Sequence, residues 1–288
     1  MNINITYYYH SGFSCEIGDS IFIFDYWTGE NSEIPKGKRI TSEYLERFRN
    51  VYVLISHSHP DHFDPIVYDW YNSGRVNYIV SYEMPVGTRG KRMSPGDIYV
   101  IDEKVQIKAF DSTDLGVSYL LQYDGFNIFH AGDLNFWHWR EESSAQEIEE
   151  AEEAFKTACI PLENEKIDVA FFPVDYRQGR LFDAGAVYFT MTVKPRLLIP
   201  MHFWGRPEVP IEFARRMRNN DTEIIAMTEL GDQIRLDVAD DGFMTINIIS
   251  GSTSEADQYL QDEGKHDIDP YEKKDPFLDT DLPVRLDE

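Results

Sequence analysis

The sequence has few cysteines, few basic residues and no long apolar run. Its two cysteines, Cys15 and Cys159, are too few for a disulfide framework, so we expect reduced thiols. No apolar run approaches the length of a membrane-spanning helix, and the first residues lack the basic and apolar regions of a targeting segment. These absences predict a cytoplasmic protein that does not associate with a membrane.

The deficit of basic residues restricts the range of partners. The chain carries 27 Lys and Arg against 51 Asp and Glu, a formal net charge of −24 at pH 7. Nucleic acids bind basic surfaces, so a nucleic acid is not an expected partner, and most of the acidic excess is expected to serve solubility. We expect a small-molecule substrate. The sequence carries no signal for or against a homo-oligomer.

Apolar residues are plentiful over most of the chain. Hydrophobic residues make up 42% and aromatic residues 14% of the 288 positions, which is enough for a large core. After Gly251 the apolar content falls, and Asp, Glu, Lys, Ser and Pro dominate. We therefore predict one domain over residues 1–250 and an acidic tail over 251–288, either disordered or laid over the body.

Strand patterns alternate with a smaller number of helical ones. β-branched and aromatic runs bounded by turn residues predict strands over 2–9, 15–24 (two strands around a Gly-Asp turn), 51–55, 76–81, 97–101, 105–110, 116–123, 126–131, 167–174, 196–200, 223–227, 233–238 and 243–249. Helices are expected over 41–49, 64–73, 144–159, 183–192 and 210–219. β meanders and βα units in both halves predict an α+β fold, a four-layer αββα sandwich of two packed mixed β-sheets flanked by helices.

The strongest chemical signal is the stretch from Ser56 to His62, which follows the predicted strand over 51–55. His57 and His59 are two positions apart in an extended segment and point the same way. Pro60 favours a bend that brings Asp61 and His62 back toward the same point. Imidazole and carboxylate ligands suit Zn²⁺, with Mn²⁺ or Fe as alternatives. The competing interpretation is an ordinary polar loop.

Other reactive side chains stand at the ends of predicted strands. Loops at one edge of a rigid sandwich commonly carry a functional site. The residues concerned are His10, Asp25, Asp133, Asp175 and His202, together with the loop from His57 to His62.

Four motifs together carry a resemblance to a known superfamily. They are His57-Ser-His59-Pro-Asp61-His62, Ala131-Gly132-Asp133, Ile199-Pro-Met-His202, and His10-Ser-Gly-Phe-Ser-Cys-Glu with Phe24-Asp25-Tyr-Trp. On these motifs the chain resembles the metallo-β-lactamase fold superfamily of metal-dependent hydrolases over about residues 3–249. Its opening hairpin and its last histidine motif further resemble the L-ascorbate-6-phosphate lactonase-like subgroup.

The resemblance implies the ligands of a centre with one or two metal ions per chain. His57 and His59 would bind one ion, and Asp133 would bridge to a second. Asp61, His62 and His202 would bind the second ion. Asp61 and His202 are the expected catalytic residues, because Asp61 can also orient or deprotonate a shared water.

One position departs from the superfamily pattern. A further histidine is expected between the signature loop and Asp133, as the third ligand of the first metal. Here the matching stretch, residues 111–116, contains no histidine. Either Asp114 or Asp111 replaces that ligand, which would favour harder ions such as Mn²⁺, or the first position binds metal weakly.

Three further residues are candidates for contact with a substrate. His10 precedes the opening hairpin and has a second interpretation, that it orients a metal ligand. His138 lies between two tryptophans and is equally compatible with packing. Arg177 follows a strand and suits an anionic group, although a salt bridge explains it as well. His130 lies inside a predicted strand and is expected to be structural.

The resemblance implies a metal-dependent hydrolase in which a metal-bound water or hydroxide cleaves a small, anionic ester, lactone or phosphoester. Such an enzyme needs no serine or cysteine nucleophile. One alternative is a phosphodiesterase or nuclease of the same fold, which would call for a basic groove. The other is a non-catalytic metal-binding member with a degenerate first site.

Overall fold

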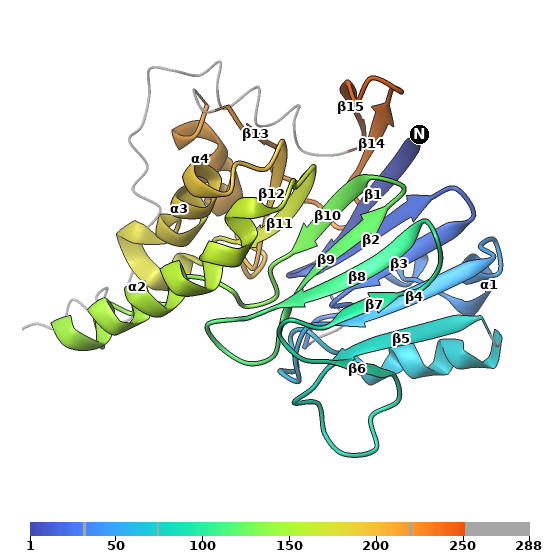
Figure 1. The fold of residues 1–288 in the computed structure, drawn as a ribbon, viewed down its shortest axis with the longest axis horizontal. Coiled ribbons are helices and arrows are strands. Elements are labelled where there is room, and N and C mark those ends of the chain that lie inside the picture. The colour runs from blue at the N-terminus through green and yellow to red at the C-terminus, as the bar shows by residue number, and fades with distance from the viewer. Residues whose placement is uncertain (31–32, 74, 219–220, 251–288) are drawn as a thin grey trace, which may run out of the picture.

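The computed structural model describes residues 1–30, 33–73, 75–218 and 221–250. Two mixed β-sheets pack face to face with helices outside them, as Figure 1 shows. This arrangement confirms the predicted α+β sandwich. The tail predicted over 251–288 lies outside the described residues. None of the helices in the described ranges is both long and apolar enough to cross a membrane.

The first sheet has eight strands in the order β15-β14-β1-β2-β3-β4-β5-β6. From β3 to β6 the neighbours run parallel, whereas β15, β14, β1, β2 and β3 pair antiparallel. The strand bounds are β1 (Asn2–Tyr9), β2 (Gly12–Ile17), β3 (Ser20–Phe24), β4 (Asn50–Ile55), β5 (Val76–Ser81), β6 (Lys91–Met93), β14 (Gln233–Val238) and β15 (Met244–Ser250).

The second sheet has seven strands in the order β13-β12-β11-β10-β9-β8-β7. Strands β10 to β13 run parallel, and β7 to β10 form an antiparallel meander. The strand bounds are β7 (Ile98–Val100), β8 (Val105–Phe110), β9 (Ser118–Tyr123), β10 (Phe126–His130), β11 (Val169–Pro173), β12 (Leu197–Met201) and β13 (Glu223–Ile224).

Helices cover the outer faces of both sheets. The helices α2 (Ala145–Cys159), α3 (Ala184–Thr192) and α4 (Glu208–Arg216) lie beside the second sheet in Figure 1. The predicted capping box opens α2, with the Ser144 side chain accepting from the backbone of Glu147. On the first sheet lie α1 (Ser42–Leu45) and the 3₁₀ segment η2 (Pro65–Ser73). Shorter 3₁₀ segments are η1 (Lys36–Lys38), η3 (Ile160–Asn164) and η4 (Tyr176–Leu181).

Two predicted helices and one strand differ between the sequence analysis and this structure. The segment predicted as a helix over 64–73 is a 3₁₀ helix, with i to i+3 bonds such as that from Val67 N to Asp64 O. The helix predicted over 41–49 is one short turn. Strand β6 was not predicted, because three residues rich in charge give no alternating pattern.

The main core lies between the sheets and under α2, α3 and α4. Aromatic rings from facing strands meet there, and the ring centroids of Phe13 and Phe171 are 4.2 Å apart. Each fully buried phenylalanine contributes about 1.5–3 kcal/mol. The sandwich therefore holds its strand ends rigidly in place.

Candidate metal centre

The predicted site residues gather at one edge of the sandwich. Strands β1, β3 and β4 of the first sheet end at His10, Asp25 and the loop from Ser56 to His62. Strands β10 and β12 of the second sheet lead to Asp133 and His202. Parallel strands end at the same edge of a sheet, so the topology alone brings these segments together.

Two glycines let the second sheet approach the signature loop. Gly116 and Gly132 have φ of 76° and 54°, which favour glycine. A Cβ on Gly116 would lie 2.1 Å from the Ser56 carbonyl oxygen, and one on Gly132 would lie 2.8 Å from the Ser56 Cβ. The backbone of Val117 donates to that same Ser56 oxygen at 3.1 Å. Side chains larger than hydrogen would therefore push the two halves of the site apart.

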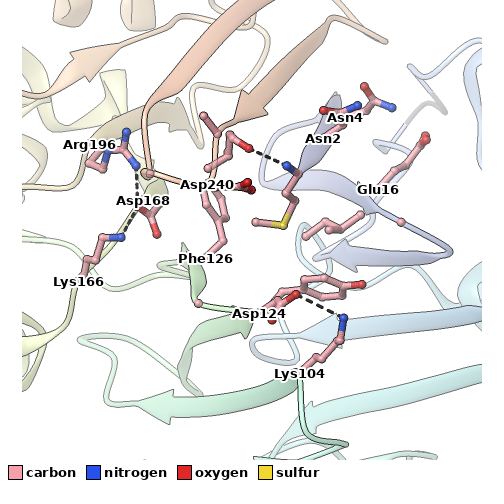
Figure 2. A pocket seen from close by; sticks show the side chains of 18 residues that line it. Asn2, Asn4, Glu16, Lys104, Asp124, Phe126, Lys166, Asp168, Arg196 and Asp240 are labelled. Atoms are coloured by element: carbon pink, nitrogen blue, oxygen red, sulfur yellow. Dashed lines mark hydrogen bonds and ion pairs between the residues drawn. The ribbon is translucent and has the colours of Figure 1, made fainter.

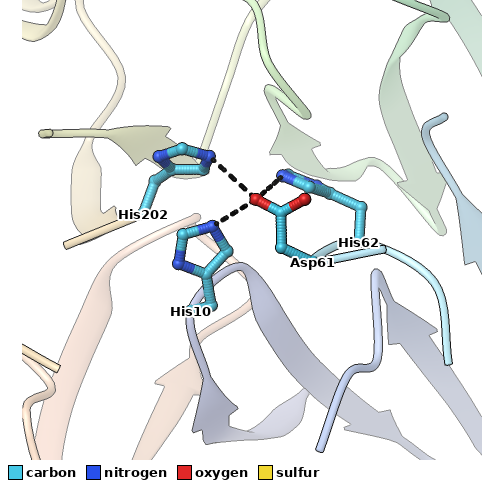
Figure 3. A group of neighbouring side chains, drawn as sticks. All are labelled: His10, Asp61, His62 and His202. Carbon is cyan, nitrogen blue, oxygen red and sulfur yellow. Dashed lines mark ion pairs between the residues drawn. The ribbon is translucent and has the colours of Figure 1, made fainter. Parts of the chain in front are cut away.

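The first cluster consists of His10, Asp61, His62 and His202. Figure 3 shows the three imidazoles directed at one carboxylate oxygen of Asp61. That oxygen lies 3.2 Å from His10 Nε2, 3.9 Å from His62 Nε2 and 3.8 Å from His202 Nε2. Asp133 joins the group from the second sheet, with Oδ1 3.0 Å from His62 Nε2 and 3.3 Å from His202 Nε2.

The second cluster consists of His57, His59 and Asp133. His57 Nε2 lies 3.3 Å from Asp133 Oδ2 and 3.1 Å from His59 Nδ1. Asp114 Oδ2 is 3.9 Å from His59 Nδ1, and the Asp114 side chain is 44% exposed. Asp133 thus presents one carboxylate oxygen to each cluster.

The donor atoms of the first cluster fit a metal ion. His62 Nε2, His202 Nε2, Asp133 Oδ1 and both ring nitrogens of His10 are buried and make no hydrogen bond within the described part of the chain. Buried polar atoms are almost always hydrogen-bonded, so several unpaired atoms facing one another require an explanation. Neutral imidazole nitrogens and carboxylate oxygens are the ligands that Zn²⁺ and similar ions take.

Asp25 orients the histidines of the first sheet. His62 Nδ1 donates to Asp25 Oδ2 at 2.8 Å, which leaves Nε2 directed into the cluster. Ser56 donates through its backbone and its hydroxyl to Asp25, and that hydroxyl accepts from His57 Nδ1 at 2.9 Å. One buried carboxylate therefore fixes two rings of the candidate metal site, directly and through Ser56.

Asp175 has the corresponding role on the second sheet. His202 Nδ1 donates to Asp175 Oδ2 at 2.9 Å. Arg177 donates to both oxygens of the same carboxylate, and Trp204 Nε1 donates to it at 3.3 Å. Carboxylates that hold the far nitrogen of a histidine are typical of metal sites.

The electrostatics of the cluster favour ionised carboxylates. Burial raises the pKa of Asp133, but His62 and His202 outweigh it and hold that pKa well below its usual value. The pKa of Asp61 is likewise lowered, because His10 and His62 outweigh burial. Burial lowers the pKa of His62, yet Asp133 and Asp25 outweigh it and raise that pKa well above the usual value.

Left-handed backbone conformations are concentrated around the centre. The φ angles are 53° at His10, 39° at Asp25, 67° at His202, 36° at Trp139 and 53° at Trp204. Non-glycine residues seldom adopt this region, and such strain is most often found at functional sites.

The remaining candidates fall in different places. Arg177 lines the cavity beside the centre. His138 is buried, with Nε2 donating to the Leu181 carbonyl at 3.1 Å, so its placement gives no support to a substrate contact. Asp111 is exposed and accepts from its neighbour Ser112. His130 is fully buried and bonded to Ser11 O and Gly132 N.

A cavity of about 450 Å³ opens onto the centre. It is lined by His59, Asp61, Thr113, Asp114, Asp133, Trp137, Trp139, Arg177, His202 and Trp204. Small-molecule sites have volumes of roughly 300–1,000 Å³, so this cavity suits a compact substrate.

A larger cavity of about 780 Å³ lies at the opposite edge of the sandwich (Figure 2). Its cations are already paired, since Lys166 and Arg196 both contact the buried Asp168 and Lys104 contacts Asp124. Among the described residues that line it there is no histidine and no cysteine. We therefore place the candidate function at the metal-facing edge.

Sequence reasoning assigned no role to several residues of this site. Asp25 was noted as a strand-end residue and as part of an opening motif, Asp175 only as a strand-end residue, and Ser56, Trp139 and Trp204 received no role. The available signal was the carboxylate that follows a predicted strand at Asp25 and at Asp175. The pairing of each carboxylate with its own histidine depends on contacts across 27 and 37 positions of sequence.

Comparisons with known proteins find sequence similarity to proteins named metal-dependent hydrolases. No protein-family model matches the chain. It is 23% identical over 248 residues to a UPF0173 metal-dependent hydrolase of Thermococcus onnurineus, covering 78% of this chain and 96% of the relative. It is 27% identical over 236 residues to a protein of the same description from Nanoarchaeum equitans, covering 74% of this chain and 95% of that one.

Solved structures agree on the fold. Igni18, described as a novel metallo hydrolase from Ignicoccus hospitalis, superposes with a TM-score of 0.61 at 20% identity, covering 83% of this chain and 100% of that one. The metallo-β-lactamase fold protein YhfI from Bacillus subtilis gives 0.52 at 13% identity, covering 85% and 99%.

The architecture thus defines the class, and the chain has the metallo-β-lactamase fold. Its sequence relatives are proteins named UPF0173 metal-dependent hydrolases. These comparisons do not establish the finer resemblance to the L-ascorbate-6-phosphate lactonase-like subgroup.

Proposed function

We propose that this protein is a metal-dependent hydrolase of a small anionic ester, lactone or phosphoester. The observation that carries the proposal is the convergence of unpaired, buried imidazole nitrogens and carboxylate oxygens beside an open cavity. The similarity to proteins named metal-dependent hydrolases supports it.

The residues present would hold two ions. Asp61, His62 and His202 would bind one, His57 and His59 the other, and Asp133 would bridge them through its two oxygens. His10 Nε2 faces Asp61 Oδ2, the oxygen that His62 and His202 also face, so His10 is a further candidate ligand or orienting group. The ions, Zn²⁺ with Mn²⁺ or Fe as alternatives, would polarise the scissile bond and lower the pKa of a bound water.

The protein side chains supply orientation. Asp61 is 18% exposed and lines the cavity, and its lowered pKa keeps it ionised at neutral pH, so it can orient a water there by accepting a hydrogen bond from it. His202, held by Asp175, lines the same cavity. We propose Asp61 and His202 as the catalytic residues.

Asp114 is our candidate for the ligand that replaces the missing histidine. It lines the cavity and faces His59, whereas Asp111 has no such placement. We expect Asp114→Ala to remove close to one metal equivalent and Asp111→Ala, the matched control, to remove none. Metal analysis after equilibrium dialysis measures both. Two equivalents in both variants would show that neither aspartate is a ligand.

A non-catalytic metal-binding protein is the second candidate function. The observation that favours it is the exposure of Asp114, which lies 3.9 Å from His59. This exposure leaves the metal position beside His57 and His59 loosely enclosed. The phosphodiesterase or nuclease alternative finds less support, since the cavity is small and the chain strongly acidic.

Hydrolysis assays on chelated and reconstituted protein test the proposal. The panel consists of 4-nitrophenyl acetate, γ-butyrolactone, 4-nitrophenyl phosphate and bis(4-nitrophenyl) phosphate. We expect hydrolysis of at least one ester, lactone or monoester that returns with Zn²⁺ or Mn²⁺ and is lost in Asp133→Asn. The control Asp124→Asn, in a distant turn, should remain active. Metal binding without any hydrolysis would favour the non-catalytic function.

Two finer points belong to this proposal. The resemblance to lactonase-like hydrolases makes a lactone the first substrate to try. A cytoplasmic location is supported by the two cysteines, Cys15 and Cys159, which are buried and unpaired.

A further inference from the structure

Three tryptophans form a wall of the cavity beside the metal centre. Trp137 and Trp139 stack with ring centroids 5.6 Å apart and planes inclined by 8°. Trp137 also lies 5.5 Å from the ring of His202. Trp204 contributes the third indole. All three are partly exposed and line the cavity.

These indoles are held in position. Trp137 Nε1 donates to the Asp133 carbonyl at 2.9 Å, and Trp204 Nε1 donates to Asp175 at 3.3 Å. Trp139 and Trp204 occupy left-handed backbone conformations that this packing must stabilise. A preorganised aromatic wall loses little entropy when a ring stacks against it.

One cation stands within this wall. The guanidinium carbon of Arg177 lies 4.6 Å from the ring centroid of Trp204 and 5.5 Å from that of Trp139. Its Nε and Nη2 donate to Asp175, so its described hydrogen bonds leave Nη1 for another acceptor. The Arg177 side chain is 40% exposed and lines the cavity.

Apart from the proposed metal ligands, the cavity offers few other polar groups. The Thr113 hydroxyl donates to the Asn135 carbonyl and accepts from the Asn135 amide, so both of its functions are already used. The Arg177 guanidinium and the Trp139 indole N–H are then the side-chain donors that remain among the described lining residues. A sugar with several hydroxyl groups would leave most of them unpaired, and each unpaired buried hydroxyl opposes binding.

We propose that the substrate is an aryl compound with a planar unsaturated ring and an anionic group. This inference rests on the proposed function and names its substrate class. The ring stacks on the tryptophan wall, the anionic group accepts from Arg177, and the hydrolysed bond faces the metal centre. Trp139 is the proposed specificity-determining residue, because it contacts both Trp137 and Arg177 and no metal ligand.

Matched diacids test the inference without turnover. Terephthalate, trans-cyclohexane-1,4-dicarboxylate and benzoate are titrated by calorimetry into metal-loaded protein, because one carboxylate can face the metal while the other faces Arg177. We expect terephthalate to bind about tenfold more tightly than the saturated diacid and more tightly than benzoate. Titration of 4-phosphonobenzoate in parallel shows whether the site binds a carboxylate or a phosphonate more tightly.

Variants assign the preference to the wall. Trp139→Leu should lower terephthalate affinity about threefold to tenfold and abolish the preference over the saturated diacid. Trp139→Phe should restore most of it, and Phe243→Leu, an exposed aromatic on another surface, should change nothing. Metal content measured in every variant separates loss of stacking from loss of the centre.

Equal binding of terephthalate and the saturated diacid, or an unchanged ratio in Trp139→Leu, would overturn this inference. Metal-dependent hydrolysis of a panel member, combined with equal binding of terephthalate and the saturated diacid, overturns it while the proposed function stands. An aromatic preference in binding, combined with no hydrolysis of any panel member, supports this assignment of the cavity and overturns the proposed function.

Discussion

Replacing Asp25 with asparagine should weaken metal binding without unfolding the protein. Asp25 is fully buried and accepts from three donors, the Ser56 backbone, the Ser56 hydroxyl and His62 Nδ1. Asparagine has the same shape and tolerates the φ of 39° at this position. However, the asparagine NH₂ group would take the place of Oδ2, which now accepts from His62 Nδ1. His62 would then lose this acceptor and favour the tautomer that carries its hydrogen on Nε2.

The expected magnitude follows from the number of rings that Asp25 controls. Loss of a carboxylate that orients a metal-binding histidine usually costs 10- to 100-fold in affinity, which is about 1.4–2.7 kcal/mol. His57 is also affected through Ser56, so both metal positions should weaken. Competition titration of Zn²⁺ against a chromophoric chelator measures the dissociation constants.

Asp168→Asn is the matched control. Asp168 is also a fully buried carboxylate beside a strand, bonded to Asn127 N at 3.0 Å and to Arg196 at 3.0 Å, but it lies at the opposite edge. We expect this variant to lower the free energy of unfolding and leave zinc affinity unchanged. A zinc affinity of Asp25→Asn within twofold of the wild type, or an equal loss in Asp168→Asn, would refute the orienting role.

Two further predictions concern the close contact of Gly116 with the signature loop and the protonation of the centre. Gly116→Ala should lower the free energy of unfolding by more than about 2 kcal/mol, because the new Cβ meets the Ser56 carbonyl. Gly125→Ala, where φ is 84° but the space around the Cβ is open, should lower it by only about 1–2 kcal/mol. Urea unfolding compares the two variants, and equal losses would contradict the close approach of Gly116 to Ser56. Burial lowers the pKa of His62, but Asp133 and Asp25 together outweigh it and raise that pKa well above its usual value, so metal must displace a proton at neutral pH. Zinc affinity should therefore rise with pH, and calorimetry in buffers of different ionisation enthalpy should show about one proton released; no release would contradict it.

The layered fold and the signature loop could be predicted from local sequence. Alternation and turn residues indicated most strands, and the loop from His57 to His62 places its ligands within six positions. The capping box at Ser144 also depends on neighbours alone. Such features need no knowledge of long-range contacts.

Features that depend on distant contacts could not be predicted. The hydrogen bond between His62 and Asp25 joins residues 37 positions apart, and the tryptophan wall combines residues from two separate loops. The choice between α and 3₁₀ geometry over Pro65–Ser73 could not be predicted either, because the same capping residues can begin both kinds of helix. His10 was interpreted as a substrate or orienting residue, and only the structure brings it into the cluster of Asp61.

Anomalous diffraction from crystals grown with Zn²⁺, measured on both sides of the zinc absorption edge, tests the metal centre most directly. The account predicts one peak enclosed by Nε2 of His62, Nε2 of His202 and the carboxylates of Asp61 and Asp133. It predicts a second peak beside His57, on the other oxygen of Asp133. Zinc peaks confined to surface carboxylates, with none between His62 and His202, would contradict the assignment of this edge as a metal centre.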